Sequence, residues 1–153
     1  MKIGFFIPNL GNNQIAIDTI AGVNTIVNNH PNIFPSIFYK EIEPSVIRPK
    51  TIATSFDKLY HYYGTIVTVN LDTTWIALQS RTIKSIYFYV YDLEWTRNIG
   101  SYMPNIQLYR HPKVELICPS KEYAEAIENY CNRQVKYVIP GLNLDEIITT
   151  IRS

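Results

Sequence analysis

The chain has 153 residues, of which 46% are hydrophobic and 18% are charged, and its formal net charge is +1. This length suits a single domain, and the composition is typical of a globular protein rather than a disordered one. The near-neutral charge, without a long run of Lys or Arg, argues against a protein that coats nucleic acid.

The two cysteines and the absence of long apolar stretches indicate a compartment. Cys118 and Cys131 form no CxxC motif, so we expect buried free thiols rather than a disulfide. No stretch approaches the ~20 apolar residues of a membrane span, and Pro8 interrupts the first apolar run too early for a signal peptide. The sequence therefore predicts a cytoplasmic protein. Its richness in Ile, Asn and Tyr, whose codons are AT-rich, indicates an AT-rich genome, that of a phage or of an AT-rich bacterium.

Six strands are expected along the chain. They are Lys2–Ile7, Phe34–Tyr39, Thr65–Asn70, Ser85–Tyr91, Val114–Cys118 and Gln134–Ile139. The third and fourth are apolar almost throughout, which is typical of strands that are covered on both faces in a parallel sheet. Pro35 cannot donate to a ladder, so the second strand is expected nearer the edge.

Five helices are expected between and after these strands. They are Gln14 to about Asn29, Ile52–Tyr63, Leu71–Gln79, a helix capped by Ser120 and a closing helix capped by Asn143. Gly22 inside the first helix is explained by close packing on the sheet. The alternation of strands and helices predicts an α/β fold, with one doubly wound, mostly parallel, Rossmann-like sheet in a single domain over residues 1–153.

Polar residues follow the expected strands where they end. These segments are Asn9–Asn13, Asn70–Thr74, Asp92–Arg97, Ser120–Lys121 and Pro140–Asn143. Because ligands of such sheets bind beyond the carboxyl ends of the strands, this edge is the expected site.

Several phrases resemble the N-terminal, acceptor-side half of a GT-B glycosyltransferase of the type in glycosyltransferase family 4. The phrases are MKIGFFIPNLGNN at the start, FYVYDLEW from Phe88, ELICPSKEYAEAI from Glu115 and VKYVIPGLNLDEI from Val135. The resemblance covers essentially the whole chain. It implies an acceptor-binding domain whose last phrase leads toward a second domain that binds the nucleotide sugar, and no carboxylate pair of that second domain is found here.

This resemblance leaves three interpretations. The chain is one subunit of a split glycosyltransferase whose partner chain brings the donor, or a stand-alone enzyme that improvises a donor site by pairing with a second copy. Alternatively, it is a non-catalytic module that binds a ligand or a protein. The implied acceptor is a sugar or another hydroxyl compound, and nucleic acid is expected only as an acceptor.

Asp92 and Glu94 are the candidate catalytic residues. They stand two apart beyond a strand, so in an extended chain both carboxylates point the same way. They would orient or deprotonate an acceptor hydroxyl or, less in keeping with the sequence, hold a divalent metal. The alternative is a solvated loop that pairs with Arg97 or Lys84. Tyr91 and Trp95 flank the carboxylates as aromatic platforms for a sugar or base.

The remaining candidates are ligand-binding residues. Gly11, Asn12 and Asn13 would present backbone N–H groups to an anion, although the family often has a glycine pair there and a plain loop with a cap is the alternative. Asp72 and Ser120 would contact the ligand or, as the alternative, cap a helix, and Lys121 would steer a phosphate. No cofactor and no metal centre are expected, and a nucleotide sugar is the implied co-substrate.

Overall fold

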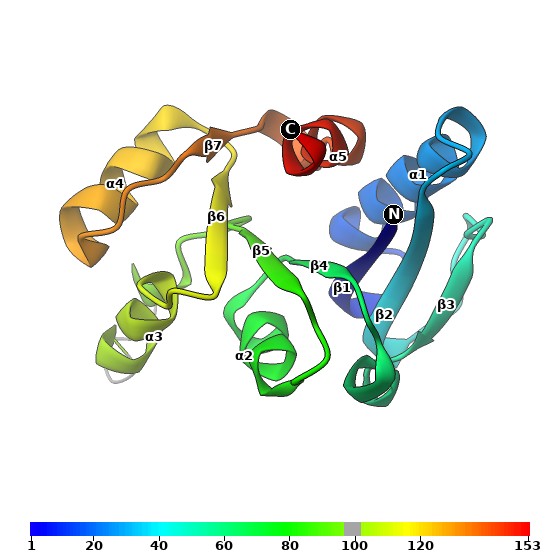
Figure 1. Ribbon diagram of the computed structural model, residues 1–153, viewed down its shortest axis with the longest axis horizontal. Helices are drawn as coiled ribbons and strands as arrows, with labels where there is room; N and C mark the ends of the chain where they lie inside the picture. Colours follow the sequence, from blue (N-terminus) through cyan, green and yellow to red (C-terminus); the bar gives the residue numbers. More distant parts are fainter. Residues whose placement is uncertain (97–101) are drawn as a thin grey trace.

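The computed structural model describes residues 1–96 and 102–153, in which strands and helices alternate (Figure 1). The strands are β1 (Lys2–Leu10), β2 (Phe34–Ile42), β3 (Ile52–Ser55), β4 (Thr65–Thr68), β5 (Ser85–Tyr89), β6 (Val114–Cys118) and β7 (Tyr137–Val138). The α-helices are α1 (Gln14–Asn29), α2 (Leu71–Gln79), α3 (Tyr102–Tyr109), α4 (Lys121–Cys131) and α5 (Leu144–Arg152). Three described 3₁₀ helices are η1 (Phe56–His61), η2 (Glu94–Thr96) and η4 (Pro140–Leu142).

The seven strands form one sheet in the order β3-β2-β1-β4-β5-β6-β7, and every neighbouring pair is parallel. Strand order reverses between β1 and β4, because the chain leaves β1 toward β2 and later returns to the other side of β1. This confirms the predicted parallel, Rossmann-like α/β fold and places its switch point beyond β1 and β4.

Helices cover both faces of the sheet and enclose two cores (Figure 1). On one face, α1 and α5 pack over side chains such as Phe5 and Val67. On the other face, η1, α2, α3 and α4 pack over the next residues in the same strands, such as Phe6 and Ile66. Successive strand residues point to opposite faces, which is why these strands are apolar almost throughout.

The predicted helix Ile52–Tyr63 is wrong. The segment instead forms β3 followed by η1, and β3 pairs with β2 from Ser36↔Ile52 to Tyr39↔Ser55. As an edge strand β3 leaves Ile52 71% exposed, so it lacks the apolar pattern of a covered strand. Consequently β2 is one strand in from the edge.

Other elements also differ from the expectation. β1 runs past Pro8 to Leu10, because its ladder with β4 ends at Phe6 and only the pairing with β2 continues. The last strand is reduced to two residues, Tyr137 and Val138. Helix α3 was not predicted at all.

Gly22 is explained by a helix contact rather than by the sheet. A Cβ placed on Gly22 would come within 2.7 Å of Leu144 Cδ1 and within 3.0 Å of Leu144 Cβ. Leu144 is the first residue of α5, so the missing side chain lets α5 approach α1 directly.

Both cysteines are buried and unpaired in the core that α2, α3 and α4 cover, Cys118 in β6 and Cys131 at the end of α4. Within residues 1–96 and 102–153, no helix is long and apolar enough to cross a membrane.

Candidate functional site

A hollow of about 410 Å³ opens at the carboxyl edge of the sheet, beside the ends of β5 and β6. Its lining residues are Asp18, Tyr89, Tyr91, Pro119, Ser120, Tyr123, Gly141 and Leu142. Four segments that are distant in sequence therefore meet here: α1, the end of β5, the β6–α4 junction and η4. Two of the predicted residues, Tyr91 and Ser120, lie in this hollow.

One wall of the hollow is fixed by the hydroxyl of Tyr89, which donates to the carbonyl of Ile139 and accepts the N–H of Leu142, each at 2.9 Å. Within η4, Gly141 and Leu142 both have positive φ, 67° and 49°. This turn exposes Gly141 at the hollow and directs the chain into α5. Burial is the main reason that the pKa of Tyr89 is raised, so the hydroxyl stays protonated and structural.

The side of the hollow next to α4 is formed by the N-cap of that helix. Ser120 Oγ accepts the N–H of Tyr123 at 3.3 Å, which confirms the expected cap and orients the first turn of α4 toward the hollow. Lys121 is exposed on that turn and does not line the hollow.

Glu94 is engaged by the backbone of a neighbouring helix. Its Oε1 accepts the N–H of Leu71, the first residue of α2, at 3.0 Å. A carboxylate is favoured at this position because the helix dipole is positive there. Glu94 therefore links η2 to α2.

Asp92 is half-buried one residue after Tyr91, on the segment between β5 and η2. Arg97, one of the partners expected for these carboxylates, lies outside the described residues. Lys84, the other, lies at the opposite end of β5, before Ser85, and so it is too far along the strand to pair with them. Burial raises the pKa of Tyr109, and the nearby charges of Glu94 and Asp92 raise it further.

Trp95 is not an open aromatic platform. It is 4% exposed, and its ring meets that of Tyr109 edge to face with centroids 4.8 Å apart. Its physical role is to pack η2 onto α3. Tyr91, by contrast, is exposed next to the hollow.

The α2 junction differs from the sequence interpretation. Asn70 rather than Asp72 caps α2, because its side chain accepts the N–H of Thr73 at 2.8 Å while Thr73 returns the interaction. Asp72 lies in the first turn and forms an ion pair with Lys40 at 2.6 Å. This ion pair joins the first turn of α2, near the switch point, to the end of β2.

The Gly11–Asn13 loop is used mainly within the fold. Asn13 caps α1 by accepting the N–H of Ala16 at 2.9 Å, and Asn12 Oδ1 accepts the N–H of Val46 at 2.9 Å. Gly11 is buried against Glu43, whose Oε2 would lie 3.1 Å from a Cβ added at Gly11. These contacts bind the loop to the β2–β3 connection, away from the Tyr91 hollow.

The predicted residues are thus spread along one edge rather than gathered in a single cluster. Tyr91 and Ser120 line the hollow, Glu94 and Asp72 lie at the start of α2, and Gly11 to Asn13 lie beyond β1. The remaining three, Asp92, Trp95 and Lys121, do not line the hollow. Among the described residues, no group of three or more His, Cys, Asp or Glu is placed to hold a metal ion.

Sequence reasoning missed four residues of the hollow: Asp18, Tyr89, Pro119 and Tyr123. Asp18 belongs to α1 and accepts a hydrogen bond from Gln14 Nε2 at 2.7 Å. Tyr123 lies in the first turn of α4. A helix beside the carboxyl edge of the sheet can place the polar groups of its side chains at that edge. One sequence, however, does not show which strand end a given helix faces.

No protein-family model matches this chain, and neither a curated protein nor a solved structure matches it significantly.

Proposed function

We propose that this domain is the acceptor-binding half of a glycosyltransferase-like protein. The observation that carries the proposal is the hollow at the carboxyl edge, lined by Tyr91, Ser120 and Tyr123 at the start of α4. Two tyrosine rings beside a hydroxyl and an exposed glycine backbone suit a sugar, because one ring can stack on its apolar face while polar groups bind its hydroxyls.

In this proposal, Asp92 is the general base. It follows Tyr91 directly, so a modest change of the segment between β5 and η2 brings its carboxylate to an acceptor hydroxyl in the hollow. A nucleotide-sugar donor would be held opposite by a second domain, a partner chain or a second copy. Glu94 has a positioning role because it fixes η2 to α2 through the N–H of Leu71.

A non-catalytic binding module is the alternative function. It is favoured by two observations: Glu94 is engaged at the start of α2, and Trp95 is buried. A domain of this kind would keep the hollow and bind a sugar or a protein without transferring anything.

Titration of ¹⁵N-labelled protein with monosaccharides and with UDP-, GDP- and ADP-sugars tests the site. We expect shifts confined to Tyr91, Ser120, Tyr123 and Gly141, and a Tyr91→Ala variant should lose them. Tyr130→Ala is the matched control, because Tyr130 lies on α4 but is 63% exposed away from the hollow. A panel that moves none of these amides would refute the acceptor site.

Turnover separates the enzyme from the module. The chain is incubated with donor and acceptor, together with its donor-binding partner where one is found, and transfer is followed by mass spectrometry. The enzyme predicts that Asp92→Asn abolishes transfer while acceptor binding remains. If the parent chain and Asp92→Asn bind the acceptor equally and neither transfers a sugar, the non-catalytic binding module is the correct function.

A further inference from the structure

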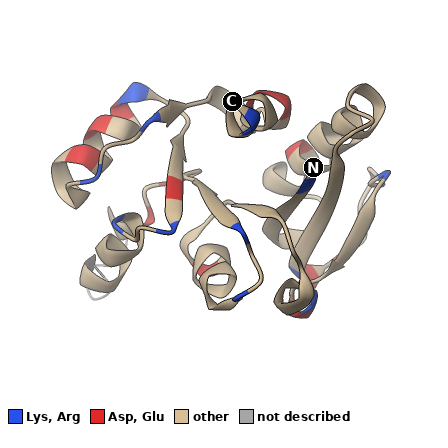
Figure 2. Cartoon of the chain, in the orientation of Figure 1, with Lys and Arg blue, Asp and Glu red and all other residues tan. Residues whose placement is uncertain are grey.

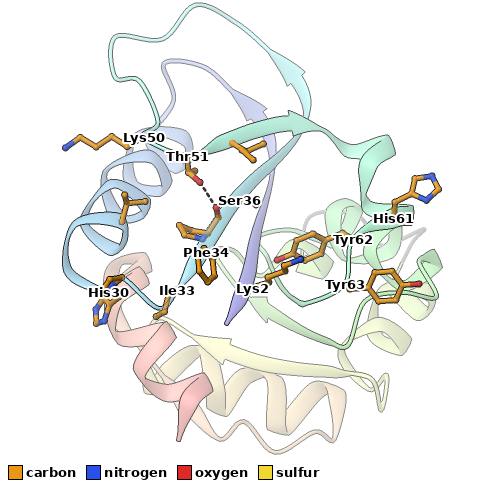
Figure 3. Close-up of a pocket in the computed structure, with 14 residues that line it drawn as sticks. Lys2, His30, Ile33, Phe34, Ser36, Lys50, Thr51, His61, Tyr62 and Tyr63 are labelled. Carbon is orange, nitrogen blue, oxygen red and sulfur yellow. Dashed lines mark hydrogen bonds between the residues drawn. The ribbon is translucent and has the colours of Figure 1, made fainter.

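A larger hollow, of about 640 Å³, lies at the opposite edge of the sheet, where β1, β2 and β3 begin (Figure 3). It is bounded by α1 on one side and by the segment after η1 on the other. Its lining residues are Lys2, Val27, His30, Pro31, Ile33, Phe34, Pro35, Ser36, Lys50, Thr51, Ile52, His61, Tyr62 and Tyr63. The volume lies within the range of roughly 300–1,000 Å³ that is usual for small-molecule sites.

The walls of this amino-edge hollow are unusually apolar for a surface. Phe34 and Ile52 are 62% and 71% exposed, and Val27 and Tyr63 are also exposed there. Large apolar side chains that gather around one concave site are typical of a binding surface, whereas single exposed ones need no explanation. The amino-edge hollow is therefore suited to bind an apolar ring or chain.

One polar group in the lining lacks a partner. The hydroxyl of Tyr62 is buried and has no hydrogen-bond partner within the described chain. A Cβ built on Gly64 would lie 2.9 Å from this hydroxyl oxygen and 2.9 Å from the backbone carbonyl oxygen of Lys2, so both oxygens border Gly64. Buried hydroxyls normally have a partner, so a ligand group is the simplest complement here. Burial raises the pKa of Tyr62, which keeps the hydroxyl a donor.

The charge of the hollow is positive. Lys2 and Lys50 line it, and no carboxylate is found among the described residues of its lining. The nearest acidic group that the contacts show, Asp145, is engaged by His30 Nε2 at 2.7 Å. Lys84 and Lys113 also precede β5 and β6 on this edge of the sheet, and Figure 2 shows Lys and Arg on several elements of the fold.

We propose that the amino-edge hollow binds a small amphipathic anion, an apolar ring or short chain that carries one negatively charged group. The apolar part packs between Phe34, Ile52 and Val27. The negative group lies between the Lys2 ammonium and the Tyr62 hydroxyl, which Figure 3 shows on the same side of the hollow. This site is independent of the carboxyl-edge proposal, because the two hollows share no lining residue.

Fluorescence titration with 8-anilinonaphthalene-1-sulfonate tests the proposal. Its uncharged analogue, N-phenyl-1-naphthylamine, measures the apolar contribution alone. We expect saturable binding of one sulfonate per chain. Lys2→Gln should weaken it roughly fivefold, the size of one partly exposed ion pair, and should leave the uncharged analogue within about twofold.

Two further variants keep the test decisive. Val27→Trp places a large side chain in the hollow and should abolish binding of both dyes, with a cooperative thermal unfolding transition like that of the parent chain as proof of folding. Tyr62→Phe should weaken only the sulfonate, without lowering the melting temperature, because the hydroxyl has no internal hydrogen bond to lose.

Lys121→Gln is the matched control, since it removes an equally exposed lysine at the opposite edge. The proposal is overturned if Lys121→Gln weakens the sulfonate as much as Lys2→Gln does. It is also overturned if folded Val27→Trp binds both dyes like the parent chain, or if no saturable binding occurs.

Discussion

The hydroxyl of Tyr89 accepts the backbone N–H of Leu142 at 2.9 Å, although 53 positions separate the two residues. The same oxygen donates to the carbonyl of Ile139. One phenol at the end of β5 thereby holds both sides of the turn that leads into α5.

Replacing Tyr89 by Phe should destabilise the protein by about 2 kcal/mol, because it leaves a buried N–H and a buried carbonyl without their partner. For a chain of this size the melting temperature should fall by roughly 4–8 °C, measured by calorimetry. Tyr130→Phe, which alters an exposed ring, should stay within about 0.5 kcal/mol of the parent. Equal stability of the two variants would show that the hydrogen bonds of Tyr89 contribute nothing.

Gly22→Ala should destabilise the protein despite the better helix propensity of Ala. The added methyl would overlap Leu144, at a cost of about 1–3 kcal/mol, and the propensity gain returns at most about 1 kcal/mol. In a Leu144→Ala background the two closest contacts, to Cγ and Cδ1, are gone and only the 3.0 Å approach to Cβ remains, so the same substitution should cost clearly less. Urea unfolding of the four proteins in this cycle measures the difference, and an unchanged effect would refute the contact.

Glu94 should matter for stability through its contact with Leu71. Glu94→Ala removes the acceptor at the start of α2 and should cost about 1–2 kcal/mol. Glu94→Gln retains an acceptor oxygen and loses only the interaction with the helix dipole, about 0.3–1 kcal/mol. Urea unfolding checks both, with the exposed Glu125→Ala as control. If Glu94→Ala is no less stable than that control, the positioning role is wrong.

Stability should fall at alkaline pH because of the buried thiols. Burial raises the pKa of Cys118 to about 12 and that of Cys131 to about 11, from an ordinary value of 9.0. The unfolded chain therefore loses these protons first, so their contribution is complete below pH 9.0 and is lost as the pH rises toward 11 and 12. The buried hydroxyls of Tyr62 and Tyr109 act in the same direction at higher pH.

Urea midpoints at several pH values between neutrality and pH 11 measure this decline. At pH 8 the thiols of the folded protein should also react with Ellman's reagent roughly 100-fold more slowly than in urea, because reaction requires opening of the core. Rapid modification of both cysteines in the native protein would contradict their burial.

The sequence was sufficient for the strands that are covered on both faces. β4 and β5 are rich in β-branched and aromatic residues, and such runs have few alternatives in an alternating α/β pattern. β3 could not be recognised, because an edge strand with Ile52 exposed shows the mixed pattern that a short helix also shows. The strand order itself is a tertiary property and became visible only in the pairing of β1 with β4.

The candidate site was predictable only to the level of an edge. Strand ends followed from the apolar pattern, and Tyr91 and Ser120, which follow two of these strands, both line the hollow at the carboxyl edge. The partners of individual side chains were not predictable, because they join distant segments: Glu94 meets Leu71, and Asp72 meets Lys40. The burial of Trp95 depends on α3, a helix that the sequence pattern did not indicate.

The central place of β1 has a consequence during synthesis. This strand is translated before both of its neighbours, β2 and β4, and Phe6 finds its β4 partner only at Thr68. Until the ribosome has released that later segment, Phe5, Phe6 and Ile7 have no completed sheet to enter. The nascent chain therefore carries its most apolar strand unprotected, and chaperone binding to this stretch would shield it until the sheet can close.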